Sequence, residues 1–441
     1  MVPPFERVQK NRSPVFERVQ EGCVTSVVHL LLTRAADFRH RVTAVKRIAA
    51  GLTAAALVAL FVPATASASF GTDVRFATFN ASLNRAAAGQ LVTDLSTPGN
   101  AQAQEVAEVI QRNRADVQLI NEFDYVPGNA AADLFRKNYL AVGQHGAKPI
   151  DYPYAYTAPV NTGVPTGFDL DRSGTVGGGN DAQGFGAFEG QYGLLVLSKY
   201  PIDLAHVRTF QHFLWKDMPG ALLPDDPATP APHDWYNAAE LNVLRLSSKS
   251  HWDLPLKIGR STVHFLVSHP TPPSFDGPED RNGTRNNDEI RFWADYVTPG
   301  KGGYLYDDRG HRGGLGASER FVIAGDNNSD PLDGDSVPGA IDRLLHARRV
   351  IETHPGSQGA VLAAQAQGGA NVGQKSNPFF DTGDFNDVAP GNLRTDYVLP
   401  SKGLVPWCAE VFWPVPSDPL SRLNDASDHH LVRVDVVVPR G

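Results

Sequence analysis

The sequence predicts an α+β fold, a four-layer α/β/β/α sandwich of two packed mixed β-sheets flanked by helices. Two observations lead to this prediction. Short apolar runs recur along the chain, and several alternate apolar with polar or small residues, as strands covered on one face do. Helical periodicity separates some of these runs, whereas others follow one another directly. A sandwich of two sheets with helices outside accommodates this order.

Eight apolar runs are the expected strands. In chain order they are VRFATF (74–79), VQLI (117–120), LLVLS (194–198), LNVLRL (241–246), VHFLVS (263–268), RFVIAG (320–325), TDYVLP (395–400) and LVRVDVVV (431–438). Apolar residues recur at helical spacing in 103–113, 288–297 and 339–350, which predicts three helices. The polar stretches 160–190, 211–238, 270–318 and 355–392 are expected to form loops at a rim, where functional insertions usually lie.

The N-terminal region has the pattern of a targeting segment. Basic residues between 39 and 47 precede the apolar stretch 48–62, and small residues follow it. This order predicts a secretory signal peptide over 42–68 and a secreted protein. A membrane anchor is the alternative, but the apolar stretch is shorter than the roughly 20 residues that a spanning helix needs. Residues 1–41 repeat FERVQ, and we expect a non-native or unstructured extension before the true translation start.

Net charge limits the classes of partner. Residues 1–68 hold nine basic and four acidic residues, so the remainder carries 31 basic and 44 acidic residues and a net charge of −13. Such a surface repels polyanions at long range, which disfavours tight binding of nucleic acid. It does not exclude an enzyme that touches phosphate only at its active site. No composition break divides residues 72–440, so we expect one domain there.

Polar residues stand at the ends of the apolar runs. They are Asn80, Glu122, His269, Asp326 with Asn327 and Asn328, Asp396, and Asp428 with His429. If these ends meet at one edge of the sandwich, they form an acidic pocket that contains imidazoles. Carboxylate and amide oxygens suit Mg²⁺ or Mn²⁺, whereas zinc is disfavoured because no compact His/Cys spacing occurs. An imidazole paired with a carboxylate could take or give a proton.

This set of motifs resembles the endonuclease/exonuclease/phosphatase superfamily, in the family's order, over essentially all of residues 73–438. The stretches that carry the resemblance are TFNAS, LINEFD, YGLLVLSKYPI (192–202), SHPTPP, GDNN, RTDYVL and SDHH. The resemblance implies that residues 72–440 form one such domain with long loop insertions. It also implies a metal-dependent phosphoesterase that uses an activated water in an in-line attack.

Roles follow from the resemblance residue by residue. It implies a metal site of Asn80, Glu122 and Asp428, and proton transfer by His429, which Asp396 orients. Asp326 would position or activate the water, while His269 and Asn328 would hold phosphate oxygens. Two departures stand out: Asn327 replaces the usual hydrophobic or small residue, and no acidic partner for His269 can be placed.

Three further segments are candidates. Asp169, Asp171 and Ser173 match the start of a calcium-binding loop, but position twelve is Asn180 rather than Glu, and a glycine-rich flap is the alternative. Arg281 and Arg285 are secondary candidates for binding substrate phosphate. RLSSKSHWD (245–253) could bind an anionic or aromatic group, although a solvated hairpin is favoured. A second aspartate motif, GDFND (383–387), is expected to be a loop turn, because no strand precedes it.

The sequence therefore predicts a secreted phosphoesterase with Mg²⁺ or Mn²⁺, and with Ca²⁺ if the 169–180 loop binds it. Its substrate would be a phosphate ester from nucleic acid, a phospholipid head group or a small phosphodiester. An extracellular nuclease is one alternative. A catalytically silent, calcium-binding adhesion protein is another, from a different class. We expect a monomer without a stable protein partner or a membrane anchor.

Overall fold

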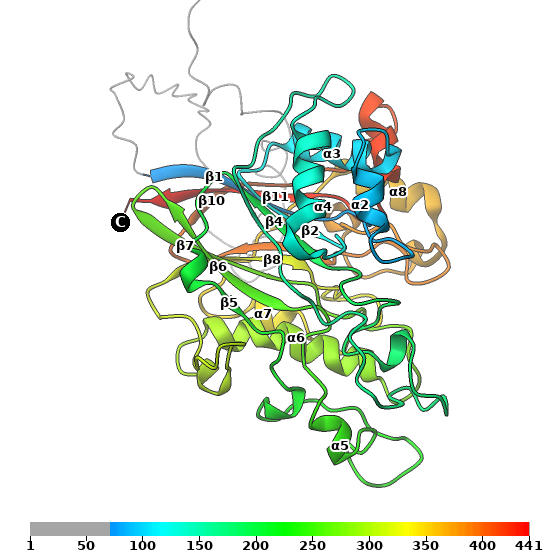
Figure 1. Cartoon of the computed structure of the whole chain (residues 1–441). Coiled ribbons are helices and arrows are strands. Elements are labelled where there is room, and N and C mark those ends of the chain that lie inside the picture. The colour runs from blue at the N-terminus through cyan, green and yellow to red at the C-terminus, as the bar shows by residue number, and fades with distance from the viewer. Residues whose placement is uncertain (1–70, 441) are drawn as a thin grey trace, which may run out of the picture. The chain divides into compact units, whose positions relative to one another are not determined.

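Two mixed β-sheets form the centre of the protein (Figure 1). The computed structural model describes residues 71–440, so the predicted extension and signal peptide lie outside the described residues. The first sheet has the order β10-β11-β1-β2-β4-β3 and the second has the order β5-β6-β7-β8-β9. The pairs β1/β2 and β7/β8 are parallel and the other pairs are antiparallel.

The strand and helix bounds are as follows. The first sheet consists of β1 (Gly71–Asn80), β2 (Val117–Asn121), β3 (Tyr154–Tyr156), β4 (Leu194–Ser198), β10 (Val405–Val411) and β11 (Val432–Pro439). The second consists of β5 (Arg208–Thr209), β6 (His251–Ile258), β7 (Ser261–Ser268), β8 (Arg320–Asp326) and β9 (Asp396–Pro400). The α-helices are α2 (Gln90–Leu95), α3 (Ala101–Asn113), α4 (Ala130–Phe135), α5 (Ala238–Leu241), α6 (Arg281–Val297), α7 (Asp342–Leu345) and α8 (Gln358–Gln367).

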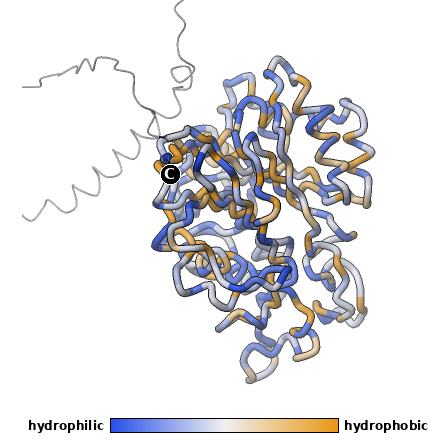
Figure 2. The backbone as a smooth tube through the Cα atoms, turned by 60° about the vertical axis from the view of Figure 1, so that its left-hand side comes forward, coloured by the Kyte–Doolittle hydropathy of each residue, from blue (hydrophilic) through white to orange (hydrophobic). Residues whose placement is uncertain are grey.

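The alternation of side chains along each strand separates the layers. In β1, Phe76 faces the other sheet and packs on Phe265, with ring centroids 5.6 Å apart, whereas Phe79 belongs to the cluster under α2, α3 and α4. The outer face of the second sheet packs on α6 through side chains such as Phe292 and Trp293. Apolar and polar segments accordingly alternate along the backbone tube in Figure 2. The predicted four-layer α+β sandwich is thus the observed fold.

Most predicted strands coincide with observed ones to within a few residues, but 241–246 is not a strand. Helix α5 ends at Leu241, Asn242 and Val243 form a turn, and the rest of that run makes one bridge, between Arg245 and Leu214. Leu244 and Leu246 are nevertheless buried against α6. The alternation of apolar residues in 241–246 therefore reflects burial of the leucine side chains and does not indicate a β-strand.

Strands β6 and β10 were missed because each contains a proline. The carbonyl of Pro255 in β6 accepts a hydrogen bond from Asp203 N. The nitrogen of Pro255 faces the same way, away from β7, so no hydrogen bond between β6 and β7 is lost. Strand β10 is an edge strand with a bulge after Pro406. Proline is tolerated in both places.

The predicted helix 339–350 shortens to α7. Beyond it the chain must leave the helix, because Val350 pairs with Ser401 next to β9 and Ile351 N donates to Pro400 O. None of the helices in residues 71–440 combines the length and apolar character needed to cross a membrane. The domain limits at 72 and 440 stay predictions.

Candidate active site

Strand polarity brings the predicted site residues to one edge of the sandwich. Strands β1 and β2 are parallel and pair Asn80 with Asn121, so Asn80 and Glu122 emerge side by side. Strands β7 and β8 are also parallel, which places His269 beside the end of β8. Strand β9 starts where β8 ends, and Asp326 pairs directly with Asp396. The start of β11, just after His429, lies beside the end of β1.

His429 lies between two buried carboxylates. Its Nδ1 is 2.8 Å from Asp396 Oδ2, and its Nε2 is 3.6 Å from Asp326 Oδ2. The hydroxyls of Thr382 and Thr395 donate to the same Asp396 oxygen. Burial alone would lower the pKa of His429, but the charges of Asp396 and Asp326 outweigh it and raise that pKa well above the usual range. The imidazole is therefore held as a cation.

Asp326 is the most connected carboxylate of the group. Its Oδ2 is 3.1 Å from Asn80 Nδ2 and 3.3 Å from His269 Nε2, and its Oδ1 accepts from Asn328 N at 2.9 Å. Burial would raise its pKa, but the charges of His429 and His269 prevail and lower it far below the usual range. Asp326 is consequently a weak base that stays ionised.

Close backbone packing fixes the position of Asp326. A Cβ on Gly325 would lie 2.1 Å from Ser268 O, so only glycine allows β8 to approach β7 this closely next to the carboxylate. Asn328 has φ of 50°, in the left-handed region that asparagine tolerates, and its Nδ2 donates to Pro270 O at 3.1 Å. Asp326 and Asn328 thus project from one rigid strand end.

Glu122 and Asn80 form a second acidic corner. Glu122 has φ of 59°, and this left-handed turn costs roughly 1–2 kcal/mol for a side chain with a Cβ. Its Oε1 accepts from Asn80 Nδ2 at 3.1 Å, and its Oε2 accepts from Asn84 Nδ2 at 2.8 Å. Asn80 Nδ2 also reaches Asp326, so this amide links the two sheets at the site.

The oxygen atoms at this corner suit a hard divalent cation. Glu122 is half-buried and Asp428 is exposed, and both line the same cavity. Ser82 Oγ donates to Asp428 Oδ1 at 3.1 Å. Asn80 turns its Nδ2 toward Glu122 and Asp326 and its Oδ1 toward Ser82 N, 3.2 Å away, so the amide presents nitrogen rather than oxygen to these carboxylates. Carboxylates of this kind fit Mg²⁺ or Mn²⁺ better than softer metals. Glu122 and Asp428 are therefore the better candidates.

A second set of possible ligands overlaps the proton-transfer group. Ligand atoms of Asp326, Asp396 and His429 lie within 4.8 Å of one another. His429, however, is already hydrogen-bonded to Asp396, and its raised pKa favours a proton at both ring nitrogens. The proton-transfer roles of Asp326, Asp396 and His429 stay predictions.

His269 is buried with its Nε2 toward Asp326. Its Nδ1 is buried and has no hydrogen-bond partner among the described residues. The acidic partner that the sequence could not place is therefore absent at Nδ1 within residues 71–440, and Asp326 is the carboxylate that His269 contacts.

The second aspartate motif lies in the wall of the site. Residues 383–387 form no strand, in keeping with the expected loop. Asp384 N donates to Asp428 O, and the ring of Phe385 meets His429 edge-on with centroids 5.1 Å apart. The Asp384 carboxylate accepts from Gln367 at 2.6 Å. The motif thus supports the segment that carries His429, through backbone and ring. Sequence reasoning missed Phe385, because motif letters alone do not reveal a ring contact.

The two arginine candidates are largely engaged within the protein. Arg281 pairs with Glu279. Arg285 is buried and donates to the carbonyls of Leu246, Gln183 and Arg245. Both line the active-site cavity, but these bonds favour a structural role for Arg285. Substrate binding by Arg281 stays a prediction.

The candidate calcium loop brings three carboxylates together. Ligand atoms of Asp169, Asp171 and Asp181 lie within 4.8 Å of one another. Asp181, which the loop pattern did not include, is buried and accepts from Leu170 N and Gly177 N. Ser173 N donates to both Asp169 and Asp171. Calcium binding at this loop stays a prediction.

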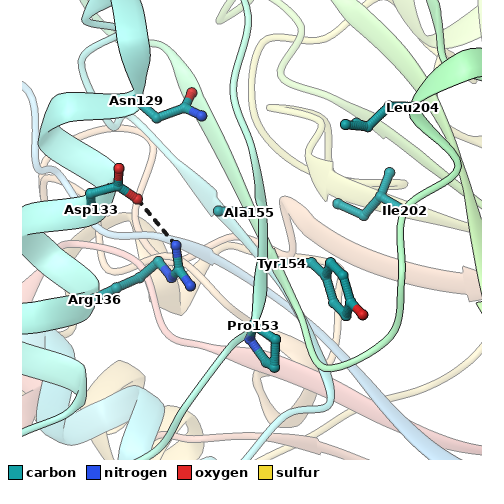
Figure 3. Close-up of a pocket in the computed structure, with 8 residues that line it drawn as sticks. All are labelled: Asn129, Asp133, Arg136, Pro153, Tyr154, Ala155, Ile202 and Leu204. Atoms are coloured by element: carbon teal, nitrogen blue, oxygen red, sulfur yellow. Dashed lines mark hydrogen bonds and ion pairs between the residues drawn. The ribbon is translucent and has the colours of Figure 1, made fainter.

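A cavity of about 990 Å³ connects these parts. Glu122, His269, Asp326, Asp428 and His429 line one part of it. The rest is lined by Lys249, by the start of α6, and by residues within 170–192, 236–248, 271–275, 328–336 and 384–395. A smaller cavity of about 210 Å³ lies elsewhere, between α4, β3 and residues 202–204 (Figure 3). It contains the Asp133–Arg136 ion pair and no predicted site residue.

The model of the Endonuclease/Exonuclease/phosphatase family matches residues 77–429. A search of curated proteins found no match. An endonuclease/exonuclease/phosphatase from Beutenbergia cavernae DSM 12333 is 16% identical, with 83% of this chain and 72% of that chain covered and a TM-score of 0.43.

Two further solved structures belong to proteins of more specific identity. Sphingomyelinase C from Streptomyces griseocarneus is 16% identical, with 82% of this chain and 99% of that chain covered and a TM-score of 0.44. A beta toxin mutant from Staphylococcus aureus with bound magnesium ions is 15% identical, with the same coverage and a TM-score of 0.39.

Proposed function

The chain belongs to the Endonuclease/Exonuclease/phosphatase family, and we propose that it hydrolyses a phosphate ester by in-line attack of water at the site described above. The observation that carries the proposal is the position of His429. It is held between Asp396 and Asp326 in the wall of a cavity that Glu122 and Asp428 also line. A buried imidazole between carboxylates beside an acidic corner is suited to phosphoryl chemistry.

Each residue would have a distinct task. Asp326 stays ionised, so it would orient the attacking water by accepting a hydrogen bond, and would take the water proton as the new O–P bond forms. His429 is fixed through Nδ1 by Asp396 and would give its Nε2 proton to the leaving oxygen as the bond from phosphorus to that oxygen breaks. The proton on Asp326 would then return to His429 Nε2, which lies 3.6 Å from Asp326 Oδ2. His269 and Asn328 would hold phosphoryl oxygens as negative charge develops on them.

Glu122 and Asp428 would hold a divalent ion, with Asn80 nearby. Mg²⁺ or Mn²⁺ is our proposal, because the candidate ligands are oxygen atoms. When bound, the ion would supply positive charge against the substrate phosphate. The backbone turn at Glu122 and the hydrogen bond from Asn84 would keep the carboxylate aimed at the cavity before any ion arrives.

Secretion is part of the proposal and rests on the predicted signal peptide at 42–68. The N-terminal sequence of protein recovered from culture medium is expected to begin near residue 69. A secreted product that retains residues 1–41 would contradict both the cleavage and the proposed later translation start.

A substrate panel tests the catalytic proposal. Protein that lacks residues 1–68 would be assayed with Mg²⁺, Mn²⁺ or Ca²⁺ against plasmid DNA, RNA, sphingomyelin and bis-p-nitrophenyl phosphate. We expect turnover of at least one phosphodiester and its loss in His429→Ala. The matched control is His206→Ala, because His206 is exposed and pairs with Asp203 away from the site. Turnover that survives His429→Ala, or no turnover of any substrate, would defeat the proposal.

A further inference from the structure

Lys249 is a buried lysine that lines the active-site cavity. Only 6% of its surface is exposed. The preference for a solvated hairpin over 245–253 was wrong, because residues 246–250 are buried and β6 starts at His251. Lysine is almost never this buried unless it is paired, so its surroundings need an explanation.

The ammonium of Lys249 has no hydrogen bond or ion pair with any residue in the described range 71–440. The two arginines that line the cavity are engaged: Arg281 pairs with Glu279, and Arg285 donates to three backbone carbonyls. Among the lysine and arginine side chains that line the cavity, Lys249 is thus the one whose hydrogen-bonding capacity is left for a ligand. An ammonium offers three donors and no acceptor, so the ligand that fits it is an anion.

The segment that carries Lys249 is rigidly tied to the segment that carries His269. Glu289 of α6 accepts from Ser248 N at 2.6 Å and from Thr271 N at 2.8 Å. Ser248 Oγ donates to Glu289 as well, at 3.0 Å. One buried carboxylate therefore holds the residues next to Lys249 and His269 in a fixed relation. The distance between the segment that carries Lys249 and the segment that carries His269 is therefore set by the protein itself and not by a bound substrate.

The chain at Gly184 packs directly on the same segment. A Cβ on Gly184 would lie 1.9 Å from Ser248 O, so the backbone here approaches Ser248 as closely as a glycine permits. Lys249 O accepts from Asn161 N at 2.8 Å. The main chain at Lys249 is therefore fixed on two sides, and its side chain is left to face the cavity.

The charges around Lys249 are consistent with a binding site for an anion. Burial lowers the pKa of Lys249, and the charges of Glu289, Glu122 and Asp326 offset only part of this effect. A phosphoryl group that arrives between Lys249 and His269 would add negative charge next to a cation that lacks a close partner.

We propose that the Lys249 ammonium binds a non-bridging phosphoryl oxygen of the substrate in the cavity that His269 also lines, and stabilises the negative charge that grows there during attack. The identification of the anion as the substrate phosphoryl group rests on the proposed function. The geometry itself requires only an anion with hydrogen-bond acceptors.

The test compares Lys249→Met and Lys249→Arg with Lys257→Met. Lys257 lies on β6 but is exposed and pairs with Asp203, so its loss should change nothing at the cavity. Loss of one preorganised donor to a developing oxyanion typically costs about 100-fold or more in rate. We expect kcat/KM for bis-p-nitrophenyl phosphate to fall about 100-fold in Lys249→Met and less in Lys249→Arg. Lys257→Met should match wild type.

Two further measurements separate this role from a structural one. Removal of a buried, unpaired charge should leave the thermal midpoint of Lys249→Met unchanged or higher, even as activity falls. The affinity for inorganic phosphate, measured by calorimetry with Mg²⁺, should fall at least about 10-fold. A lowered midpoint with unchanged phosphate affinity, or kcat/KM within about twofold of wild type, would overturn the proposal.

The same experiment separates failure of this inference from failure of the proposed function. If wild type hydrolyses no phosphoester but binds phosphate through Lys249, the proposed function fails and the anion site stands. If wild type is active and Lys249→Met binds phosphate and turns over equally well, the anion site fails and the proposed function stands.

Discussion

The substitution Asp→Asn can be made at two aspartates that line the same cavity, Asp326 and Asp384. Both belong to a Gly-Asp motif with a nearby asparagine, so their sequences alone look similar. Their surroundings differ. Asp326 is 1% exposed and contacts Asn80, His269 and the backbone N of Asn328. The Asp384 carboxylate accepts from Gln367 and makes no hydrogen bond or ion pair with Asn80, His269 or His429.

The expected loss at Asp326 can be estimated from these contacts. In Asp326→Asn, one end of the side chain becomes an NH₂ group, which must face either the Asn80 and His269 side or Asn328 N. Either orientation opposes donors to donors and removes a negative charge that, after that of Asp396, raises the pKa of His429. The change therefore disrupts a positioned acid–base group, and such a group contributes about 10²–10⁴-fold in rate.

The assay is kcat/KM for bis-p-nitrophenyl phosphate with Mg²⁺, beside the thermal unfolding of each variant. Asp326→Asn is expected to lose about 10²–10⁴-fold in kcat/KM while it still folds. Asp384→Asn keeps a hydrogen-bonding partner for Gln367 and should stay within about threefold of wild type. Full activity in Asp326→Asn together with abolished activity in Asp384→Asn would refute the reasoning and exchange the two roles.

Three other predictions follow from particular contacts. Asp396→Asn should lower kcat by about 10³–10⁴-fold, because the imidazole of His429 loses the acceptor at Nδ1 that fixes its protonation and orientation; retention of the wild-type kcat would contradict this. Burial, followed by the charges of Asp330 and Asp333, raises the pKa of Asp381 from 3.8 to about 8. The folded protein then holds a proton that the unfolded chain releases, so wild-type stability falls as pH rises between these values. The gain in thermal midpoint of Asp381→Asn should accordingly grow from pH 5 to pH 8, and a loss at pH 8 would show that the carboxylate is ionised and held by another group. Asp169→Asn should abolish calcium binding measured by calorimetry, whereas calcium binding that this change does not affect would place the ion elsewhere.

Much of the fold could be predicted from the sequence, because sheets buried on one face impose a period of two. The runs that became β1, β2, β4, β7 and β8 were identified within a few residues. The same rule failed at 241–246, where alternation reflected packing on α6 without hydrogen bonds to a sheet. It also failed at β6, where Pro255 lies at a position that needs no donor toward β7.

The candidate site was predictable in part for a similar reason. Its residues follow strands, and parallel or antiparallel pairing decides whether strand ends meet. Asp326 and Asp396 became direct neighbours in the β8/β9 ladder although 70 positions separate them in the sequence. Asp181 and Phe385 were not predicted. Asp181 lies beside Asp169 and Asp171, and Phe385 lies beside His429, only because the loops pack together in the folded protein.

The sequence by itself determined which residues stand at strand ends, and hence the family and the class of chemistry. Those are local properties, set by residue order and by the period of the strands. The tertiary structure decided which charges are paired. Arg285 and Lys249 look equally available in the sequence, yet one is engaged by carbonyls from 183, 245 and 246 and the other faces the cavity. Whether a charged side chain is paired depends on atoms from distant parts of the sequence that the fold brings together. No local sequence pattern gives the distance between such atoms.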